Sequence, residues 1–569
     1  MMKYTRKNYI DFLDRELEAQ EKNYKATIQT KATLLKDRGE VFVGMFQTVN
    51  AAGFAVFKIR NSDNIPSKKS FWTAVFLTGE MARFKNWGNL SWNNLRAKYQ
   101  RGFSDCLCAW VSKSDDPSLC LVGIKNLTID FLELLKPGKT IIAFGPKDPP
   151  VQYLMNLKAI VKDENNPDVG HILNFSENNH QWAPQKVGAH TDLVSKLLNS
   201  LTGEKCVVVQ GPPGTGKTTR MAQLASKLLK ENNSVLVTAL TNQALIELAK
   251  KSDLREFIEN GKVSKTSLTG DELRELPTLQ RVKENKCNAT NGNLTLATFY
   301  VASGWGLDIS DIPFDYVIMD EASQALLPMI AAAMKLGRKV ILIGDQKQLP
   351  PIVLTNEDLI LRYGWADIIK GFQTICNYFD YSSYMLSDTY RLTQRGAECT
   401  GVFYNNSLYS VSSHKKVITG ITDLNTKGGP VIKELDMEVG KKAPQNAVEY
   451  VYALTRNLLI EDPKAEIAVL SKFKETKRTL QNYFNRNWNG NSYPDNVKIE
   501  TIDSVQGLTV HYCIFLIPDA SIRYSLDPEL FNVATSRAMY NTILVLPSTL
   551  YRDRIPKEVI DYLIMASQQ

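Results

Sequence analysis

The sequence predicts an α/β protein with parallel sheets in its C-terminal two thirds, preceded by a helical segment and a small β-rich domain. Three changes of pattern along the chain support this prediction. Residues 8–38 are charged and carry a loose apolar stripe of helical spacing. Residues 40–160 contain short runs rich in Val, Phe, Ile and Trp that are separated by Gly, Pro, Asn and Asp. From about residue 189 to the end, apolar strand-like runs alternate with amphipathic helical segments.

The composition is that of an intracellular globular protein with several domains. At 569 residues the chain is too long for one small module, and 44% hydrophobic residues are enough to form large cores. The net charge of +8 permits a polyanionic partner without arguing strongly for one. The longest apolar stretches fall short of the roughly 18 residues of a membrane span. Eight scattered cysteines suit a reducing compartment, so we expect a cytoplasmic protein with no membrane partner.

Cys106, Cys108 and Cys120 form the one cluster of cysteines in the sequence. A structural zinc site needs four ligands, and a fourth is not evident near them. Cys106 and Cys108 alternate with Trp110 in the way that one face of a buried strand does. We therefore expect these thiols to pack in a core.

The strongest local signal is a glycine-rich loop between a predicted strand and a predicted helix. The β-branched run 207–209 leads into the loop, and an amphipathic segment follows it. The glycines let backbone amides surround phosphates, Lys217 reaches the β and γ phosphates, and Thr218 ligates Mg²⁺. The residues predicted to bind nucleotide here are Gly211, Pro212, Pro213, Gly214, Thr215, Gly216, Lys217, Thr218 and Thr219.

Two later strands end in polar side chains that belong at the same sheet edge. Residues 316–319 are apolar and run into Asp320 and Glu321. Asp320 is expected to hold Mg²⁺, and Glu321 to polarise the water that attacks the γ-phosphate. A third strand, "RKVILIGDQKQLPP", places Gln348 where an amide can sense the γ-phosphate. These segments predict a magnesium-dependent NTPase, although kinases, GTPases, transporters and motors all use such a core.

The order of "GPPGTGKT", "DEASQA" and "GDQKQLPP" resembles that of the superfamily 1 helicases. The likeness is greatest to the branch that contains the nonsense-mediated-decay RNA helicase and the immunoglobulin-mu-binding helicase. This resemblance implies two RecA-like P-loop NTPase lobes after a helical stalk and a small β-barrel. It implies the domains 1–39 (stalk), 40–160 (barrel), 161–188 (linker), 189–375 (first lobe, with a small helical insertion at about 252–290) and 376–569 (second lobe).

Further segments resemble the same family and assign roles to more residues. "TALTNQALIELAKK" and "LTLATFYVASG" are similar to nucleic-acid motifs, which implies contacts from Thr241, Asn242 and Thr298. The resemblance assigns the remaining roles as follows: Tyr390 near the base, Arg391 and Arg537 as arginine fingers at the γ-phosphate, Gln506 and Gly507 in the motif that couples nucleic acid to ATP, and Thr501 as a nucleic-acid contact.

Three positions depart from the family pattern. Val194 stands where the family has an adenine-reading glutamine, Thr389 replaces a glutamine before Tyr390, and Thr509 replaces a glutamate. The first of these leaves the recognition of adenine unexplained by the family's usual contact.

The resemblance implies an ATP-dependent helicase or translocase that moves 5′ to 3′ on single-stranded DNA or RNA, with ATP and Mg²⁺ as cofactors. ATP binds between two lobes in such motors, and its hydrolysis resets their closure. Two alternatives remain at the level of sequence: a nucleic-acid-stimulated ATPase that remodels complexes without unwinding, and an ATPase switch that ignores nucleic acid. A monomer is expected, with a possible protein partner in repair, RNA turnover or defence.

Overall fold

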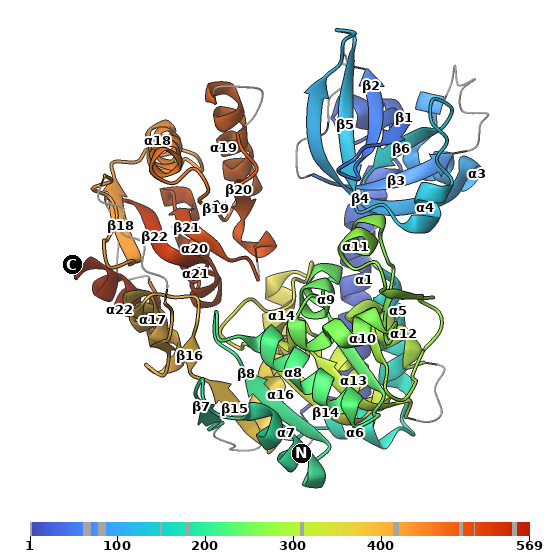
Figure 1. The fold of residues 1–569 in the computed structure, drawn as a ribbon, viewed down its shortest axis with the longest axis vertical. Helices are drawn as coiled ribbons and strands as arrows, with labels where there is room; N and C mark the ends of the chain where they lie inside the picture. Colours follow the sequence, from blue (N-terminus) through green and yellow to red (C-terminus); the bar gives the residue numbers. More distant parts are fainter. Residues whose placement is uncertain are drawn as a thin grey trace.

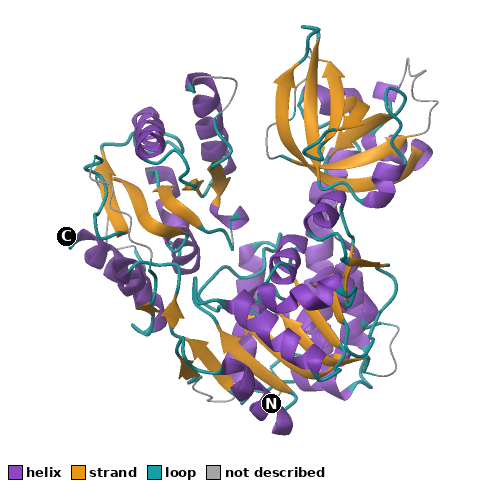
Figure 2. Ribbon diagram, viewed as in Figure 1, coloured by secondary structure: helices purple, strands orange, loops and turns teal. Residues whose placement is uncertain are grey.

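A computed structural model gives the arrangement of three bodies: a barrel, a large lobe beneath it and a second lobe beside that one (Figures 1 and 2). It describes residues 3–60, 66, 70–77, 87–147, 151–177, 182–307, 312–413, 420–488, 493–505, 507–548 and 555–568. Gln506, which the sequence assigns to the coupling motif, lies outside these residues. No helix in the described ranges is long and apolar enough to cross a membrane.

The N-terminal stalk is one long helix and one short one, α1 (Arg6–Ile28) and α2 (Ala32–Asp37). Thr5 and Asn8 form a capping box at the start of α1. Tyr9, Phe12 and Leu13 are buried and pack in the same core as α5 (Val151–Lys162). The helix expected over 8–38 is therefore interrupted at residues 29–31, and its first half belongs to the large lobe.

The β-rich region forms a closed antiparallel barrel, as the family resemblance implied. Its strands follow the order β1 (Phe42–Val49), β2 (Ala55–Arg60), β5 (Leu119–Lys125), β4 (Gln100–Lys113), β3 (Phe71–Leu77) and β6 (Ile141–Gly145), and β6 pairs with β1. The helices α3 (Trp92–Tyr99) and α4 (Ile129–Glu133) lie outside it. Cys106, Cys108 and Cys120 are buried in the barrel core, which confirms their packing role. Among the described residues, no group of three or more His, Cys, Asp or Glu side chains is arranged to hold a metal ion.

The first lobe is a nine-stranded parallel sheet covered by helices on both faces. The strand order is β11 (Gln280–Val282), β10 (Val263–Thr266), β12 (Leu294–Thr298), β9 (Val235–Ala239), β13 (Phe314–Met319), β14 (Gly337–Gly344), β8 (Cys206–Gln210), β15 (Ser383–Leu386) and β7 (Gln185–Val187). One face carries α7 (Leu193–Gly203), α8 (Lys217–Lys230), α9 (Asn242–Ala249) and α10 (Arg255–Glu259). The other carries α5, α6 (Pro167–Leu173), α12 (Phe299–Trp305), α13 (Leu327–Leu336), α15 (Ala366–Ile369) and α16 (Gly371–Tyr378), with α14 (Glu357–Tyr363) at its margin.

The range 252–290 is not a helical insertion, so that prediction was wrong. Besides α10 and α11 (Gly270–Glu275), it contains β10 and β11, which hydrogen-bond to the main sheet. Strand β10 was not predicted because Lys265, a charged residue, lies inside this four-residue strand, although all four residues are buried. The sheet also extends past both expected limits of the lobe, through β7 in the predicted linker and β15 beyond residue 375.

The second lobe has a five-stranded parallel sheet, so the predicted fold class is confirmed. Its order is β18 (Gly429–Leu435), β22 (Ala538–Pro547), β21 (Val510–Leu516), β19 (Ile467–Ser471) and β20 (Val497–Thr501). One face packs on α18 (Gln445–Glu461) and α19 (Lys474–Asn487). The other packs on α21 (Pro528–Thr535), α22 (Lys557–Ser567) and the end of α17 (Gln394–Gly401), with α20 (Ile522–Ser525) alongside. A small pair, β16 (Asp388–Thr389) with β17 (Tyr409–Ser410), lies between the lobes.

Candidate nucleotide site between the two lobes

The glycine-rich loop connects the buried strand β8 to helix α8. Gly211 donates its backbone N–H to the carbonyl of Gly344 at 2.8 Å, which joins the loop to the end of β14. Gly214 and Gly216 have φ of +72° and +78°, in the left-handed region that glycine adopts without strain. Lys217 begins α8, and its Nζ donates to the carbonyl of Gly211 at 2.6 Å. The loop therefore presents backbone amides and a lysine at the start of a helix, the arrangement that binds phosphates.

The other predicted loop residues occupy the same turn. The Thr215 hydroxyl donates to the carbonyl of Pro212 at 2.8 Å. Thr218 and Thr219 follow in the first turn of α8. The predicted nucleotide residues of the first lobe thus form one continuous structure.

The acidic pair follows strand β13, which is separated from β8 by β14 alone. Asp320 is 4% exposed, and its Oδ1 accepts the backbone N–H of Glu321 at 2.8 Å. Glu321 has φ of +52°, a left-handed conformation that is uncommon for residues other than glycine. Burial and the charge of Glu321 raise the pKa of Asp320 to about 7, while Lys217 opposes this shift. A buried carboxylate with a raised pKa beside a phosphate loop fits a group that binds a divalent cation.

Gln348 lies against Asp345, a residue that sequence reasoning did not assign to the site. Gln348 Nε2 donates to Asp345 Oδ2 at 2.6 Å, and Gln210 Nε2 donates to Asp345 Oδ1 at 2.6 Å. Asp345 is fully buried, and burial raises its pKa while Lys217 opposes the shift. Its carboxylate therefore fixes the orientation of two amide side chains at the carboxyl ends of β8 and β14.

The segment after β16 packs directly on the phosphate loop. Tyr390 donates its backbone N–H to the carbonyl of Gly214 at 2.9 Å, and the Thr389 hydroxyl donates to the carbonyl of Pro213 at 2.9 Å. Tyr390 is 45% exposed, and its ring lies beside Gly216. Thr389, which replaces the family's glutamine, thus keeps a direct contact with the loop.

Two arginines lie on the side of the site that faces the second lobe. Arg391 donates from Nη1 to the carbonyl of Ser536 at 3.1 Å, and Arg537 donates from Nε to the carbonyl of Val533 at 2.7 Å. Burial and the charge of Arg537 lower the pKa of Arg391 to about 9, while Glu321 opposes this shift. Burial also lowers the pKa of Arg537, and Glu321 opposes it most strongly. Both guanidinium groups therefore interact electrostatically with Glu321 of the acidic pair.

The four predicted nucleic-acid residues lie at or just after the carboxyl ends of strands, three in the sheet of the first lobe and one in that of the second. In the first lobe, Thr241 caps α9 by accepting the backbone N–H of Ala244 at 3.2 Å, and Asn242 begins that helix. Thr298 ends the neighbouring strand β12. In the second lobe, Thr501 ends β20, and Gly507 follows in a left-handed turn with φ of +78°.

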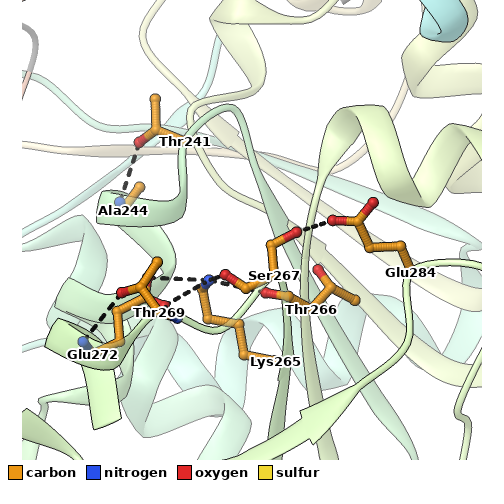
Figure 3. A network of polar contacts seen from close by, with 8 residues as sticks. All are labelled: Thr241, Ala244, Lys265, Thr266, Ser267, Thr269, Glu272 and Glu284. Carbon is orange, nitrogen blue, oxygen red and sulfur yellow. Dashed lines mark hydrogen bonds and ion pairs between the residues drawn. The ribbon is translucent and has the colours of Figure 1, made fainter. Parts of the chain in front are cut away.

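A buried lysine network that the sequence did not reveal lies close to Thr241 (Figure 3). Lys265 is fully buried in β10, and its Nζ pairs with Glu272 Oε1 at 3.1 Å. Burial lowers the pKa of Lys265, and Glu272 opposes the shift. Glu272 also completes a capping box with Thr269 at the start of α11. The network holds in place the turn that follows β10, close to the predicted nucleic-acid residue Thr241.

The chain is similar in sequence to known families and proteins. Two family models, each described as an AAA domain, match residues 191–284 with 289–356 and residues 370–548. "DNA replication ATP-dependent helicase/nuclease DNA2" of Saccharomyces cerevisiae is 30% identical over 211 residues, covering 35% of this chain and 13% of that protein. "Regulator of nonsense transcripts 1" of Caenorhabditis elegans is 25% identical over 392 residues, covering 59% of this chain and 36% of that protein.

Other similar proteins carry related names. "Uncharacterized ATP-dependent helicase MJ0104" of Methanocaldococcus jannaschii is 25% identical over 330 residues, covering 54% of this chain and 46% of that protein. The chain therefore spans less than half the length of these curated relatives. A crystal structure of Arterivirus nonstructural protein 10 (helicase) aligns with 86% of this chain and 79% of its own, at 14% identity and a TM-score of 0.37.

Proposed function

Because this chain belongs to the superfamily 1 helicases, we propose that it hydrolyses ATP between its two lobes in order to move 5′ to 3′ along single-stranded DNA or RNA. One observation carries the proposal. The phosphate loop and acidic pair of the first lobe converge with Arg391 and Arg537, and Arg391 bonds to the Ser536 carbonyl of the second lobe. A nucleotide at this junction contacts both lobes, so its hydrolysis changes how they fit together.

Each side chain of the junction has a chemical role in this proposal. Amides of the phosphate loop and Lys217 bind the β and γ phosphates. Glu321 orients the attacking water, and Arg391 and Arg537 offset the charge that develops on the transferred phosphoryl group. Gln348 reports the state of the γ-phosphate to the rest of the first lobe.

A magnesium ion fits the donors of the first lobe. Thr218 offers a hydroxyl at the start of α8, and Asp320 offers a buried carboxylate whose raised pKa would fall beside a cation. When bound, the ion would neutralise phosphate charge and help to orient the nucleotide.

The nucleic acid is proposed to lie across Thr241, Asn242 and Thr298 of the first lobe and Thr501 of the second. Threonine hydroxyls and helix-start amides suit phosphate contacts, which do not depend on base sequence. An intracellular monomer with a protein partner in repair, RNA turnover or defence stays a prediction.

The decisive experiment is steady-state ATPase with Mg²⁺, alone and with single-stranded DNA or RNA of matched sequence. We expect at least a tenfold rise with one polymer and separation of a duplex that carries a 5′ tail but not of one that carries a 3′ tail. Lys217→Ala is the negative control. Stimulation without strand separation favours the remodelling ATPase, and a rate indifferent to both polymers contradicts the motor.

A further inference from the structure

A chain of buried hydrogen bonds crosses from the first lobe to the second beside the nucleotide site. The Tyr404 hydroxyl donates to Asp345 Oδ2 at 2.7 Å, the oxygen that also accepts from Gln348. Asn532 Nδ2 donates to the same Tyr404 oxygen at 2.8 Å. Asp345 and Gln348 follow β14 of the first lobe, whereas Asn532 lies in α21 of the second. Tyr404 is the link between them.

Tyr404 is held firmly enough to act as a link. It ends the short 3-10 helix Val402–Tyr404 and is buried in the apolar core of the second lobe. Asp345, Gln348 and Asn532 are also buried, so water cannot replace a lost bond at low cost. The bond from Tyr404 to the Asp345 carboxylate is charge-assisted and is therefore the strongest type of bond in the chain.

Helix α21, which contains Asn532, makes two further contacts with the first lobe. Asn532 Nδ2 also donates to the carbonyl of Lys347 at 2.8 Å, in the loop that contains Gln348. Glu529, at the start of α21, pairs with Lys370 at 2.7 Å. Arg537 comes after Ser536, the residue that caps the end of α21. The position of α21 against the Asp345–Gln348 loop therefore decides where Arg537 lies relative to Gln348.

We propose that Tyr404 is a positioning residue that keeps Gln348 and Arg537 in a fixed relation across the lobe junction. The proposal rests on the ATP-driven function above, because it assigns Tyr404 to the step at which both side chains meet the γ-phosphate. Loss of the hydroxyl leaves Asn532 and Asp345 without their shared partner. The first lobe then keeps its phosphate loop and binds ATP, but closure no longer brings the arginine into place.

Tyr404→Phe tests this role, with Tyr512→Phe as the matched control. The Tyr512 hydroxyl is also buried in the second lobe, but among the described residues it has no hydrogen-bond partner. In Tyr404→Phe we expect kcat for ATP at saturating nucleic acid to fall at least tenfold, while KM and the dissociation constant of a non-hydrolysable ATP analogue change less than twofold. Tyr512→Phe should retain wild-type values.

A double-mutant cycle and a second readout separate positioning from general damage. Asn532→Ala removes both its bond to Tyr404 and its bond to the Lys347 carbonyl, so any further loss of kcat in the Tyr404→Phe background measures the Lys347 bond alone. In the wild type, binding of the analogue should slow hydrogen exchange in residues 346–348 and in α21 to the same extent. In Tyr404→Phe, the two segments should gain protection to different extents.

The outcomes are distinct. Unchanged kcat in Tyr404→Phe, an equal loss in Tyr512→Phe, or joint protection retained in Tyr404→Phe each overturn the proposal. A wild type whose ATPase ignores nucleic acid contradicts the proposed function instead, and the exchange experiment then still decides whether Tyr404 couples the two segments.

Discussion

Glu16 of the stalk helix gives the sharpest test of how the N-terminal region is attached to the motor. Its carboxylate is fully buried and accepts the backbone N–H groups of Leu354 and Thr355 at 2.9 Å, the Thr355 hydroxyl at 2.7 Å and Gln20 Nε2 at 2.9 Å. Leu354 and Thr355 lie in the segment that follows Gln348. Glu16 therefore connects the stalk to the loop that leads out of the nucleotide site.

Replacing Glu16 with alanine leaves the buried Thr355 amide and the part-buried Leu354 amide without an acceptor. Each such group costs about 1–3 kcal/mol, so the local structure should lose roughly 2–5 kcal/mol. Because a protein of several lobes does not unfold in one step, hydrogen exchange at the Leu354 and Thr355 amides is the suitable assay. A loss of about 2 kcal/mol predicts exchange roughly 30-fold faster at these amides.

Glu18→Ala is the control, since Glu18 lies on the same helix and, among the described residues, makes one exposed ion pair, with Arg15. Its exchange at Leu354 and Thr355 should match the wild type. If Glu16→Ala also exchanges like the wild type at these two amides, the carboxylate does not hold the loop and the reasoning fails.

Three further predictions concern the motor itself. Arg537→Ala should lower kcat by about 1,000-fold, the contribution typical of an arginine finger, while fluorescence titration shows retained nucleotide binding. Asp320 holds a proton below its pKa of about 7 in the free protein, and a cation requires the carboxylate. Mg-ATP binding at pH 6.5 should therefore release a proton, seen by calorimetry in two buffers, but not at pH 8.5 or in Asp320→Asn. Lys265→Met should lower the local stability around β10 by about 3 kcal/mol because Glu272 loses its cation, seen as faster hydrogen exchange at the β10 amides, and adding Glu272→Met should restore most of the protection.

The sequence identified those parts of the site that are continuous along the chain. The phosphate loop and the acidic pair combine residue type, strand and helix within a dozen positions, so their chemistry was predictable before the fold was known. Arg391 and Arg537 needed the family resemblance, because an isolated arginine carries no signal of its own. The structure places both within electrostatic reach of Glu321, and their role as arginine fingers stays a prediction.

The interactions that sequence reasoning missed join residues far apart in the chain. Tyr404 is 59 residues from Asp345 and 128 residues from Asn532, and no local pattern marks a tyrosine as their common partner. Strand β10 was missed for a different reason. Its lysine is of a type usually found at the surface, and it is tolerated inside because it pairs with Glu272 and donates to the carbonyls of Thr266 and Ser267. Long-range pairing therefore limited the prediction in both cases.

Besides the Glu529–Lys370 ion pair and the Tyr404 link, two hydrogen bonds hold the end of α21 against the nucleotide site. Asn532 bonds to the Lys347 carbonyl, and the Ser536 carbonyl accepts from Arg391, one helical turn farther along. The loop of Lys347 follows β14, whereas Arg391 belongs to the segment that packs on the phosphate loop through Thr389 and Tyr390. Because the two tethers grip successive turns of one helix, the second lobe cannot rotate about either bond without straining the other. We therefore expect these bonds, together with the Tyr404 link, to pass a change at the phosphate loop to α21 and so to Arg537.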